Sequence, residues 1–382
     1  MMGNYHVRFL GDKGGVIRLS YPIVATMKQI LAVSIFIFST LNAFSQSIKI
    51  EQREKIDSFY NDIILDVDSI GNNFSILSRT NAESGYDYHF YLTIINNNLK
   101  IISQKEIPNI DSIFFNYQDC IITKNNIFGL GYIDQEPDEM LPFVTSLNSN
   151  LKQNFKYYLD VKHEGNIKGF FKNNTLFVIT NNNIDYTIHT FTSSGELLDN
   201  RTFHTASADI LENVLLFKDY FLIYGWSIKN NQERFDILKL DYKCNLLTQK
   251  SVDFSDTPIS INKIGENGFA IVFESTPTKA SFYDSEVNQT KDITHIRHDY
   301  KYKNIIAVDN STDLYIGLNV DKLTAFLVKD TDVISKVEIG DIGTWGKSVI
   351  KQLNKNEFIL FTDQKRNSDF ESNIEVIKLK IE

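Results

Sequence analysis

Cysteine is scarce in this sequence of 382 residues, with Cys120 and Cys244 as the only two. No Cys-x-x-Cys or His-Glu-x-x-His motif occurs, so zinc is not supported. The histidines are scattered, and no Ser/His/Asp arrangement for nucleophilic catalysis stands out. His89 and His189 fall in expected strands, where a hydrogen-bonded structural role is predicted. The absence of a catalytic signature favours a non-enzymatic role and leaves an enzyme as the alternative.

Runs of basic residues are also missing. Beyond residue 45, no run of Lys or Arg is longer than two residues. Residues 1–45 hold four basic residues and one acidic residue, so without them the 39 basic and 48 acidic side chains become 35 and 47, a net charge of −12. A polyanion is repelled by such a surface. Nucleic acid is therefore not expected as a partner.

The most prominent apolar run, Ile30–Phe38, is shorter than the about 20 residues that a membrane-spanning helix needs. Lys28 precedes it, and the small residues Ala43 and Ser45 follow it. This order is typical of a secretory signal peptide, with small side chains at positions −3 and −1. It predicts cleavage before Gln46. An uncleaved membrane anchor is the alternative.

The stretch from Met27 to Gln46 resembles signal peptides of Bacteroidetes-type bacteria, which often start Met-Lys and end near Phe-Ser-Gln. The resemblance implies that Met27 is the true start and that residues 1–26 are an over-extended reading frame. We therefore expect residues 1–45 to be removed and residues 46–382 to be exported to the periplasm, the outer surface or the exterior of the cell. No membrane span is expected after cleavage.

A repeat runs through the rest of the chain. From residue 57 onward, four apolar runs separated by polar turns recur with a period of about 44 to 53 residues, as expected of four-stranded propeller blades. The second run of each unit begins at Phe74, Ile127, Thr175, Tyr220, Phe269, Asp313 and Phe358. These runs are too short for helices and are apolar at consecutive positions, which indicates strands covered on both faces.

Seven such units predict an all-β fold, a single seven-bladed β-propeller of four-stranded antiparallel blades over residues 46–382. A β-sandwich or a solenoid is the alternative. The seventh unit holds only three expected strands, near residues 347–353, 358–364 and 373–381. Ser47–Gln52 alternates apolar and polar residues as an outer strand should. We expect it to pair with Asn373–Ile381 and to complete the last blade.

One segment carries a family likeness. Phe235–Val252, with the sequence FDILKLDYKCNLLTQKSV, resembles the hairpin of the third and fourth strands in secreted bacterial β-propeller repeat proteins. The glycine pairs of kelch blades and the Trp-Asp of WD40 blades are absent, so the resemblance assigns no functional residue. Cys120 and Cys244 fall in units that are not neighbours. We therefore expect free thiols, with Cys120 in the core.

The loops that join one unit to the next each hold a carboxylate. These residues are Asp57, Asp111, Glu164, Asp209, Asp256, Asp299 and Asp341. If they converge on the mouth of a channel they repel one another unless a cation lies among them. A calcium ion near Asp111, Asp209, Asp256, Asp299 and Asp341 is therefore one hypothesis. The alternative is that Asp favours turns because its side chain bonds nearby backbone N–H groups.

The loop His298–Tyr302 is the richest of these connections in chemically active side chains. With residues from other connections it could form a polar pocket with aromatic walls, suited to a sugar ring. An ordinary exposed loop is the alternative. The candidate ligand-binding residues are His163, Glu164, Asp256, His298, Asp299, Tyr300, Asp341 and Trp345.

These features predict an exported, monomeric, non-enzymatic binding or scaffold protein that recognises a glycan or protein partner through loops at one face of the ring. The alternative is a carbohydrate-active enzyme, a glycoside hydrolase or lyase, with a carboxylate pair about 5 to 9.5 Å apart at the channel mouth. Asp256 and Asp299 are the first pair to test. A quinone-dependent dehydrogenase is disfavoured because the recurrent Trp motifs of that propeller class are missing.

Overall fold

The chain divides into two compact units, Met1–Ser45 and Gln46–Glu382. The computed structural model describes residues 46–56, 62–81, 88–107, 115–123, 125–136, 139–148, 150–160, 166–182, 185–204, 210–229, 232–253, 257–274, 279–294, 301–308, 312–319, 322–329, 332–341, 348–365 and 372–382. The predicted signal peptide lies outside these residues, so its removal stays a prediction.

Within the second unit, the described residues form seven antiparallel sheets of four strands each. Blade 1 contains β2 (Ile63–Ile70), β3 (Asn73–Asn81), β4 (Tyr88–Asn96) and β5 (Ile101–Ile107). Blade 2 contains β6 (Phe115–Ile122), β7 (Ile127–Glu136), β8 (Glu139–Leu147) and β9 (Gln153–Tyr158). Blade 3 contains β10 (Lys168–Lys172), β11 (Thr175–Asn182), β12 (Asp185–Thr192) and β13 (Leu197–His204).

The other four blades repeat this order. Blade 4 contains β14 (Ile210–Leu216), β15 (Tyr220–Lys229), β16 (Gln232–Asp241) and β17 (Leu246–Asp253). Blade 5 contains β18 (Thr257–Ile264), β19 (Gly268–Glu274), β20 (Lys279–Tyr283) and β21 (Gln289–Thr294). Blade 6 contains β22 (Lys301–Ala307), β23 (Thr312–Asn319), β24 (Lys322–Lys329) and β25 (Asp332–Asp341). Blade 7 contains β26 (Ser348–Asn354), β27 (Glu357–Lys365), β28 (Ser372–Ile381) and β1 (Ile48–Ile56).

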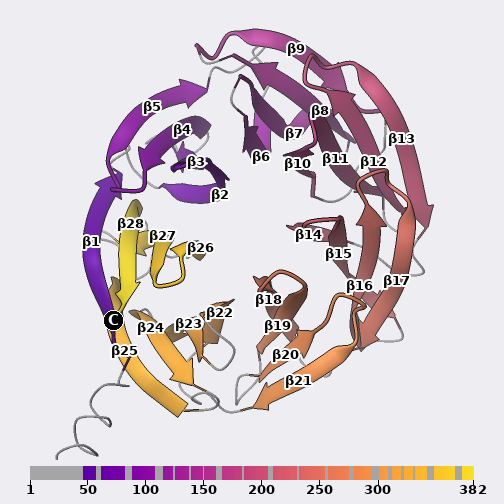
Figure 1. Cartoon of the computed structure of the whole chain (residues 1–382). Coiled ribbons are helices and arrows are strands. Elements are labelled where there is room, and N and C mark those ends of the chain that lie inside the picture. Colours follow the sequence, from indigo (N-terminus) through magenta and orange to yellow (C-terminus); the bar gives the residue numbers. More distant parts are fainter. Residues whose placement is uncertain are drawn as a thin grey trace, which may run out of the picture. The chain divides into compact units, whose positions relative to one another are not determined.

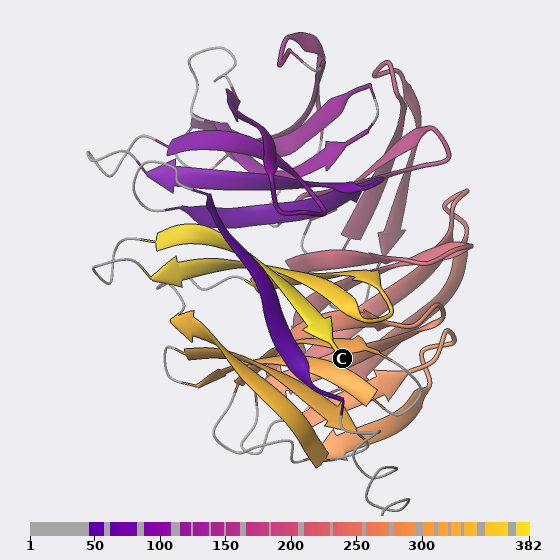
Figure 2. The same ribbon diagram turned by 60° about the vertical axis from the view of Figure 1, so that its left-hand side comes forward.

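The seven blades stand around a central axis, each with its first strand innermost and its last strand on the outside (Figure 1). The predicted seven-bladed propeller is therefore confirmed, and the sandwich and solenoid alternatives are excluded. The side view shows blades stacked face to face around the ring (Figure 2). The expected second strands correspond to β3, β7, β11, β15, β19, β23 and β27.

The predicted closure of the ring is also confirmed. β1 pairs antiparallel with β28, in a register that runs from Ile48 opposite Ile381 to Ile56 opposite Ile374. Ser47 and Glu382 extend the pairing, because the backbone N–H of each donates to the backbone carbonyl of the other, at 3.0 and 2.9 Å. The first and the last described segments of the chain thus share one sheet.

The side chains of β11 show why the inner strands are apolar on both faces. Leu176 and Val178 pack into a cluster between blades 2 and 3. Phe177 and Ile179, at the alternate positions, pack into a cluster between blades 3 and 4. Successive side chains of a strand point to opposite faces. A strand between two neighbouring blades therefore buries both sets.

Hydrophobic clusters of this kind fill each of the seven blade interfaces in the described part of the chain. One cluster joins blade 7 to blade 1 through Ile56 and Ile374 on one side and Ile64 and Phe74 on the other. The core is thus a continuous belt around the axis and not a single central cluster. Burial of apolar surface, worth about 25 cal/mol per Å², holds neighbouring blades together.

Both cysteines are free and Cys120 is buried, as predicted, and Cys244 is buried as well. Cys120 lies in β6, and Cys244 lies in the turn between β16 and β17. Burial raises the pKa of both thiols, to about 11 for Cys244. Both therefore stay protonated near neutral pH. In the described residues, no helix is long and apolar enough to cross a membrane.

Candidate binding channel

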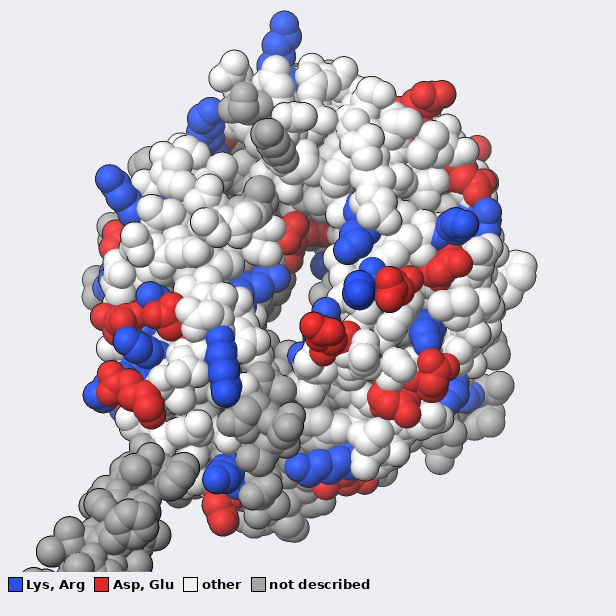
Figure 3. All heavy atoms as spheres, in the orientation of Figure 1, with Lys and Arg blue, Asp and Glu red and all other residues white. Residues whose placement is uncertain are grey.

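A cavity of about 1270 Å³ follows the axis of the ring and is lined by the innermost strands of all seven blades. The space-filling view along the axis shows the opening, with acidic and basic side chains at its rim (Figure 3). Small-molecule sites usually enclose about 300 to 1,000 Å³. This channel is therefore large enough for a ligand of several rings.

Irregularities in the inner strands direct polar side chains into the channel. The pairing with the second strand shifts just before Asp66 in β2, Asp119 in β6, Asn213 in β14 and Asn304 in β22. A bulge adds a residue to one strand and re-aims the side chain that follows. All four side chains line the cavity. In these blades the bulge thus places a polar group where the apolar pattern of a strand would otherwise continue.

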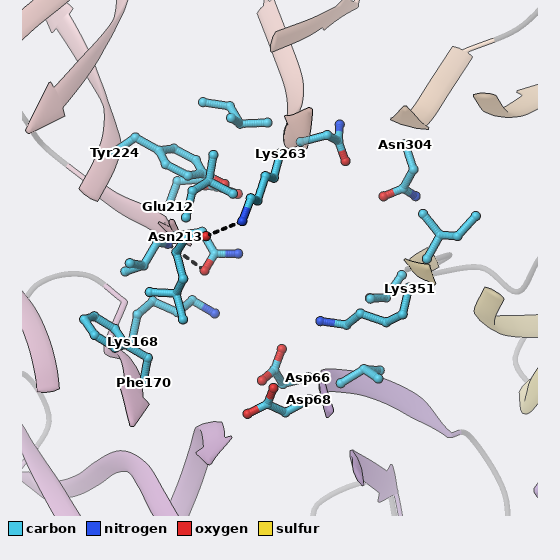
Figure 4. Close-up of a pocket in the computed structure, with 18 of the residues that line it drawn as sticks. Asp66, Asp68, Lys168, Phe170, Glu212, Asn213, Tyr224, Lys263, Asn304 and Lys351 are labelled. Carbon is cyan, nitrogen blue, oxygen red and sulfur yellow. Dashed lines mark hydrogen bonds between the residues drawn. The ribbon is translucent and has the colours of Figure 1, made fainter. Parts of the chain in front are cut away.

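Three carboxyl groups gather on the side of blades 1 and 2. Asp66 and Asp68, two residues apart on β2, lie side by side in the channel (Figure 4). Asp119 of β6 is buried and shares a hydrogen bond with Asp66. Two carboxyls can hydrogen bond only when one of them holds a proton. The pair therefore carries one negative charge where two carboxylates would carry two.

The surroundings of Asp119 account for its protonation. Burial raises the pKa of this carboxyl well above its ordinary value, and the charge of Asp66 raises it further, while Lys168 lowers it. Its two oxygens accept hydrogen bonds from the backbone N–H of Cys120 at 2.9 Å and of Gly169 at 2.8 Å. Gly169 belongs to β10, so Asp119 connects blades 1, 2 and 3 at the channel wall.

Two lysines flank the carboxyl groups. Lys168 of blade 3 and Lys351 of blade 7 both point toward the axis (Figure 4). Each acts on a carboxyl through its charge, Lys168 on Asp119 and Lys351 on Asp68. Within the described residues, neither ammonium group has a hydrogen bond or an ion pair. In order around the ring, the channel wall therefore carries Lys351, then the three carboxyl groups of blades 1 and 2, and then Lys168.

A third lysine of the channel wall, Lys263, is hydrogen-bonded to a neighbouring blade. The Lys263 ammonium of β18 donates to the backbone carbonyl of Leu216 at 2.9 Å and lies 4.9 Å from the centre of the Phe217 ring. It joins blade 5 to blade 4 and is less available to a ligand than Lys168 or Lys351. Its role is mainly structural.

Blade 4 supplies aromatic side chains to the opposite wall. Tyr224, Trp226 and Phe235 line the cavity. The Trp226 and Phe235 rings lie 4.4 Å apart between centroids, and Tyr224 meets Phe235 edge-on at 5.9 Å. Trp226 is only partly buried. Tyr224 and Phe235 are buried, and all three side chains pack in the cluster between blades 4 and 5. Of the three, Trp226 is therefore the one that keeps part of its ring outside that cluster.

Of the ligand-binding residues expected from the sequence, only Asp341 falls within the described residues. It ends β25, is exposed, and faces Lys322 in the register of β24. The others lie outside the described residues, as do four of the five expected calcium ligands. These are His163, Glu164, Asp256, His298, Asp299, Tyr300 and Trp345, and for calcium Asp111, Asp209, Asp256 and Asp299.

No group of three or more metal-ligating side chains occurs among the described residues. The calcium hypothesis thus stays a prediction about the connecting loops. Sequence reasoning concentrated on those loops and missed Asp66, Lys168 and Lys351. Their signal was present, since each is a charged residue within the apolar first strand of a unit, as in Leu65-Asp66-Val67-Asp68.

The expectation that the strand histidines are hydrogen-bonded is correct for one of the two. His89 Nδ1 lies 2.6 Å from the carboxylate of Glu106 on the next strand. His189 in β12 is buried, and its Nε2 has no hydrogen-bond partner. His189 lies on the same face of β12 as Phe191, which packs between blades 2 and 3. A strand assignment alone did not reveal that this position is enclosed.

Comparisons with known proteins show the fold of this chain but no family and no function. The sequence matches no protein-family model, and no curated protein is similar enough to match. The structure resembles the Dos1 propeller, with a TM-score of 0.52 and 10% identity over 87% of this chain and 95% of that one. It also resembles a structure of prolyl endopeptidases, with a TM-score of 0.53 and 8% identity, over 80% of this chain and 45% of that one.

A third similar structure comes from Bacteroides caccae, a protein of unknown function with a TM-score of 0.39 and 12% identity, over 65% of this chain and 90% of that one. A likeness this low does not bear on the source of the present chain. At about 10% identity the other two show a shared fold alone. The ring and its channel define a β-propeller whose architecture supports binding or scaffold roles.

Proposed function

We propose that this chain is an exported, monomeric, non-enzymatic binding protein that recognises a glycan or protein partner at one end of its ring. The observation that carries the proposal is the axial cavity, whose wall combines unbonded ammonium groups, carboxyls and the partly buried side chain of Trp226. Groups of this kind on a rigid frame select a ligand by shape and charge. The connecting loops of the sequence-based hypothesis would extend the same site at the channel mouth.

The alternative of a glycoside hydrolase gains little from the carboxyl pair in the channel. Both the retaining and the inverting class need carboxyl groups at least about 5 Å apart. Asp66 and Asp119 share a hydrogen bond and are therefore closer than that. Asp119 is also 4% exposed, with both oxygens bonded to backbone N–H groups. A hydrolase would have to use other residues, and Asp256 with Asp299 is still the pair to test.

A glycan array probed with the purified protein tests the proposal, with product analysis on each glycan that binds. We expect binding without release of shorter products. Turnover that Asp299→Asn abolishes would show a hydrolase or lyase instead. Export is tested separately by N-terminal sequencing of the protein secreted from a Gram-negative host, which is expected to begin at Gln46.

A further inference from the structure

We propose that the axial channel binds a free short peptide, with the terminal carboxylate of the peptide at Lys168 and Asn213 and its terminal ammonium group at Asp68. This inference goes beyond the proposed function, because the ligand is a small molecule with both charges, held inside the ring. Three features of the channel wall support it: a pair of open hydrogen-bond donors, an open carboxylate oxygen, and opposite charges on the two sides that hold them.

Lys168 and Asn213 form a pair of donors on neighbouring blades. The side chain of Asn166 donates to the backbone carbonyl of Leu211 at 2.8 Å and so fixes the start of β10 beside the start of β14. Lys168 and Asn213 each follow that bond by two residues, and both line the cavity. They therefore enter the channel from adjacent strands at a similar depth, as the close-up shows (Figure 4).

Both groups are open to a ligand. Within the described residues, the Lys168 ammonium makes no hydrogen bond and no ion pair. Asn213 accepts the backbone N–H of Val214 at 2.8 Å through its amide oxygen, which leaves the N–H groups of its amide available. An ammonium group beside an amide N–H₂ group offers donors for both oxygens of a carboxylate, and the bond from the ammonium is charge-assisted.

Asp68 offers an acceptor on the side of blade 1. One oxygen of its carboxylate accepts the backbone N–H of Ser69 at 2.7 Å. The other oxygen has no hydrogen bond within the described residues, and Lys351 acts on this carboxylate through its charge without forming an ion pair. Burial raises the pKa of Asp68, which reflects the loss of water around its charge. An ammonium group of a ligand would replace that water with charge-assisted hydrogen bonds.

The charges of the wall give the channel a negative side and a positive side. On blades 7 and 1, the charges of Lys351 and Asp68 cancel. The pair of Asp66 and Asp119, which shares a proton, adds one negative charge on blades 1 and 2. On blade 3, Lys168 adds one positive charge. An anion alone is repelled by the first side and a cation alone by the second, whereas a ligand with one charge at each end matches both.

Glu212 is the acidic residue that precedes Asn213, and it also lines the cavity. Its charge acts on Tyr224, which packs between blades 4 and 5, and the close-up shows Glu212 beside that ring (Figure 4). Because Glu212 is exposed, water and salt screen its charge from an anion held between Lys168 and Asn213. The carboxylate site therefore keeps its positive character.

The positions of the two sites favour a peptide over a single amino acid. Asp119 bonds to Asp66 on one side and to the backbone N–H of Gly169 on the other, so β2, β6 and β10 are level at these residues. Asp68 lies two residues further along β2, about 7 Å deeper, and blade 2 stands between it and Lys168. An extended chain spans about 3.3 to 3.6 Å per residue. A peptide of about three residues can therefore reach both sites.

Isothermal titration calorimetry with four probes tests the proposal. These are tri-alanine, tri-alanine with an acetylated N-terminus, tri-alanine with an amidated C-terminus, and free alanine. We expect tri-alanine to bind at least about tenfold more tightly than each of the others, with an affinity that falls as salt is added. Absence of tri-alanine binding, or equal or tighter binding of any other probe, would overturn the proposal.

Variants then match each end of the peptide to its site. Lys168→Gln should weaken the binding of tri-alanine about tenfold but leave the affinity for the amidated peptide unchanged, because that peptide lacks the carboxylate. Asp68→Asn keeps an acceptor for Ser69, and should weaken tri-alanine about tenfold and leave the acetylated peptide unchanged. Lys152→Gln is the matched control, since Lys152 is exposed in the loop before β9. Wild-type affinity for tri-alanine in both channel variants would contradict the assignment.

The outcomes separate this inference from the proposed function. If no probe binds while a glycan or a protein partner does, the proposed function stands and the peptide site fails. If tri-alanine binds as expected and no glycan or protein partner does, the peptide site stands and the proposed function fails. Melting curves of the variants that match wild type show that a loss of affinity arises from the replaced group and not from unfolding.

Discussion

At the scale of single residues, burial decides which charges this protein can hold. The pKa values of two buried groups are shifted in opposite directions. Burial lowers the pKa of His189 in the wall of blade 3 and raises the pKa of Asp119 at the channel. Each shift is a difference in proton affinity between the folded and unfolded chain, so each makes stability depend on pH.

Replacement of His189 should reduce the sensitivity of the fold to acid. Burial lowers the pKa of His189 to about 4, against 6.5 in the unfolded chain. Between these values the unfolded chain binds more protons, so stability is full above pH 6.5 and is lost as the pH falls toward 4, by up to about 3 kcal/mol. His189→Leu should flatten the melting temperature over this range. An unchanged pH profile would contradict the assignment.

Replacement of Asp66 should stabilise the fold at high pH, whereas replacement of His189 should stabilise it at low pH. The raised pKa of Asp119 means that the folded protein binds more protons than the unfolded chain between pH 3.8 and that raised value. The pair therefore stabilises the fold more as the pH falls through this window, and less at neutral pH. Asp66→Asn removes the repulsion and supplies an N–H donor at every pH. Thermal melts at pH 8 should show a higher melting temperature than wild type.

At the scale of strands and turns, one hairpin recurs between the third and fourth strands of blades 1 to 5. In four of the five, the first loop residue is Asn or Asp and accepts the backbone N–H groups two and four positions later. In blade 4, Asp241 accepts from Lys243 at 2.9 Å and from Asn245 at 2.8 Å. The fourth loop residue has a positive φ, and it is Leu99, Leu151, Gly195, Cys244 or Val287.

The fourth residue of this hairpin also fills an interface. Leu99, Cys244 and Val287 are buried in clusters between neighbouring blades. Blade 3 has Gly195 instead, with φ of 92°, because the ring of Phe155 occupies the space of a Cβ atom. A left-handed backbone costs a non-glycine residue of order 1 kcal/mol. Burial of the side chain offsets that cost, which explains the unusual choice of Leu, Cys and Val.

Loss of the first hairpin residue should destabilise the fold modestly. Asp241→Ala removes the acceptor for the backbone N–H groups of Lys243 and Asn245 and should lower the free energy of unfolding by about 1 to 2 kcal/mol. Asp241→Asn is the control, since the amide oxygen keeps the geometry. Urea unfolding gives both values, and equal loss in the two variants would show that the hydrogen bonds are not the cause.

The sequence predicts the strands more completely than it predicts the site. Runs such as the one from Phe74 were recognisable because both faces are apolar, and Ser47–Gln52 because it alternates. The hairpin that contains Asp241 could be recognised only by its resemblance to propeller repeat proteins. Its left-handed position holds a different residue type in different blades, so it has no signature in the sequence. The channel was missed because its charged residues come from six separate strands. Asp66 and Asp119 also follow bulges, which leave no spacing signature in the sequence.

At the scale of the whole molecule, stability depends on the completeness of the ring. Each blade packs against two others, so an opening at one interface exposes apolar faces on both sides. β1 is central to this arrangement, since Ile48 packs in the interface with blade 6 and Ile56 in that with blade 1. Its loss would expose the edge of β28 to other chains.

Deletion of residues 46–54 should therefore lower the melting temperature or cause aggregation. The deletion removes most of the partner of β28 and the ion pair between Glu51 and Lys378, at 2.9 Å. Differential scanning calorimetry and light scattering measure the two effects. The substitution Glu54→Gln, at a half-buried position of the same strand, keeps the size of the side chain and should leave both unchanged. A deletion variant with the melting curve of wild type would show that the ring does not need this strand.

The pairing of Ile48 with Ile381 has a consequence for biogenesis. Ribosomes make the chain from its N-terminus, so β1 emerges first while its only sheet partner, β28, emerges last. During nearly all of synthesis this strand has no native neighbour. Its central residues, Glu51 to Lys55, are charged or amide-bearing, and four of the five are charged. Such residues discourage improper pairing, so the composition of β1 suits a segment that must wait for the rest of the polypeptide.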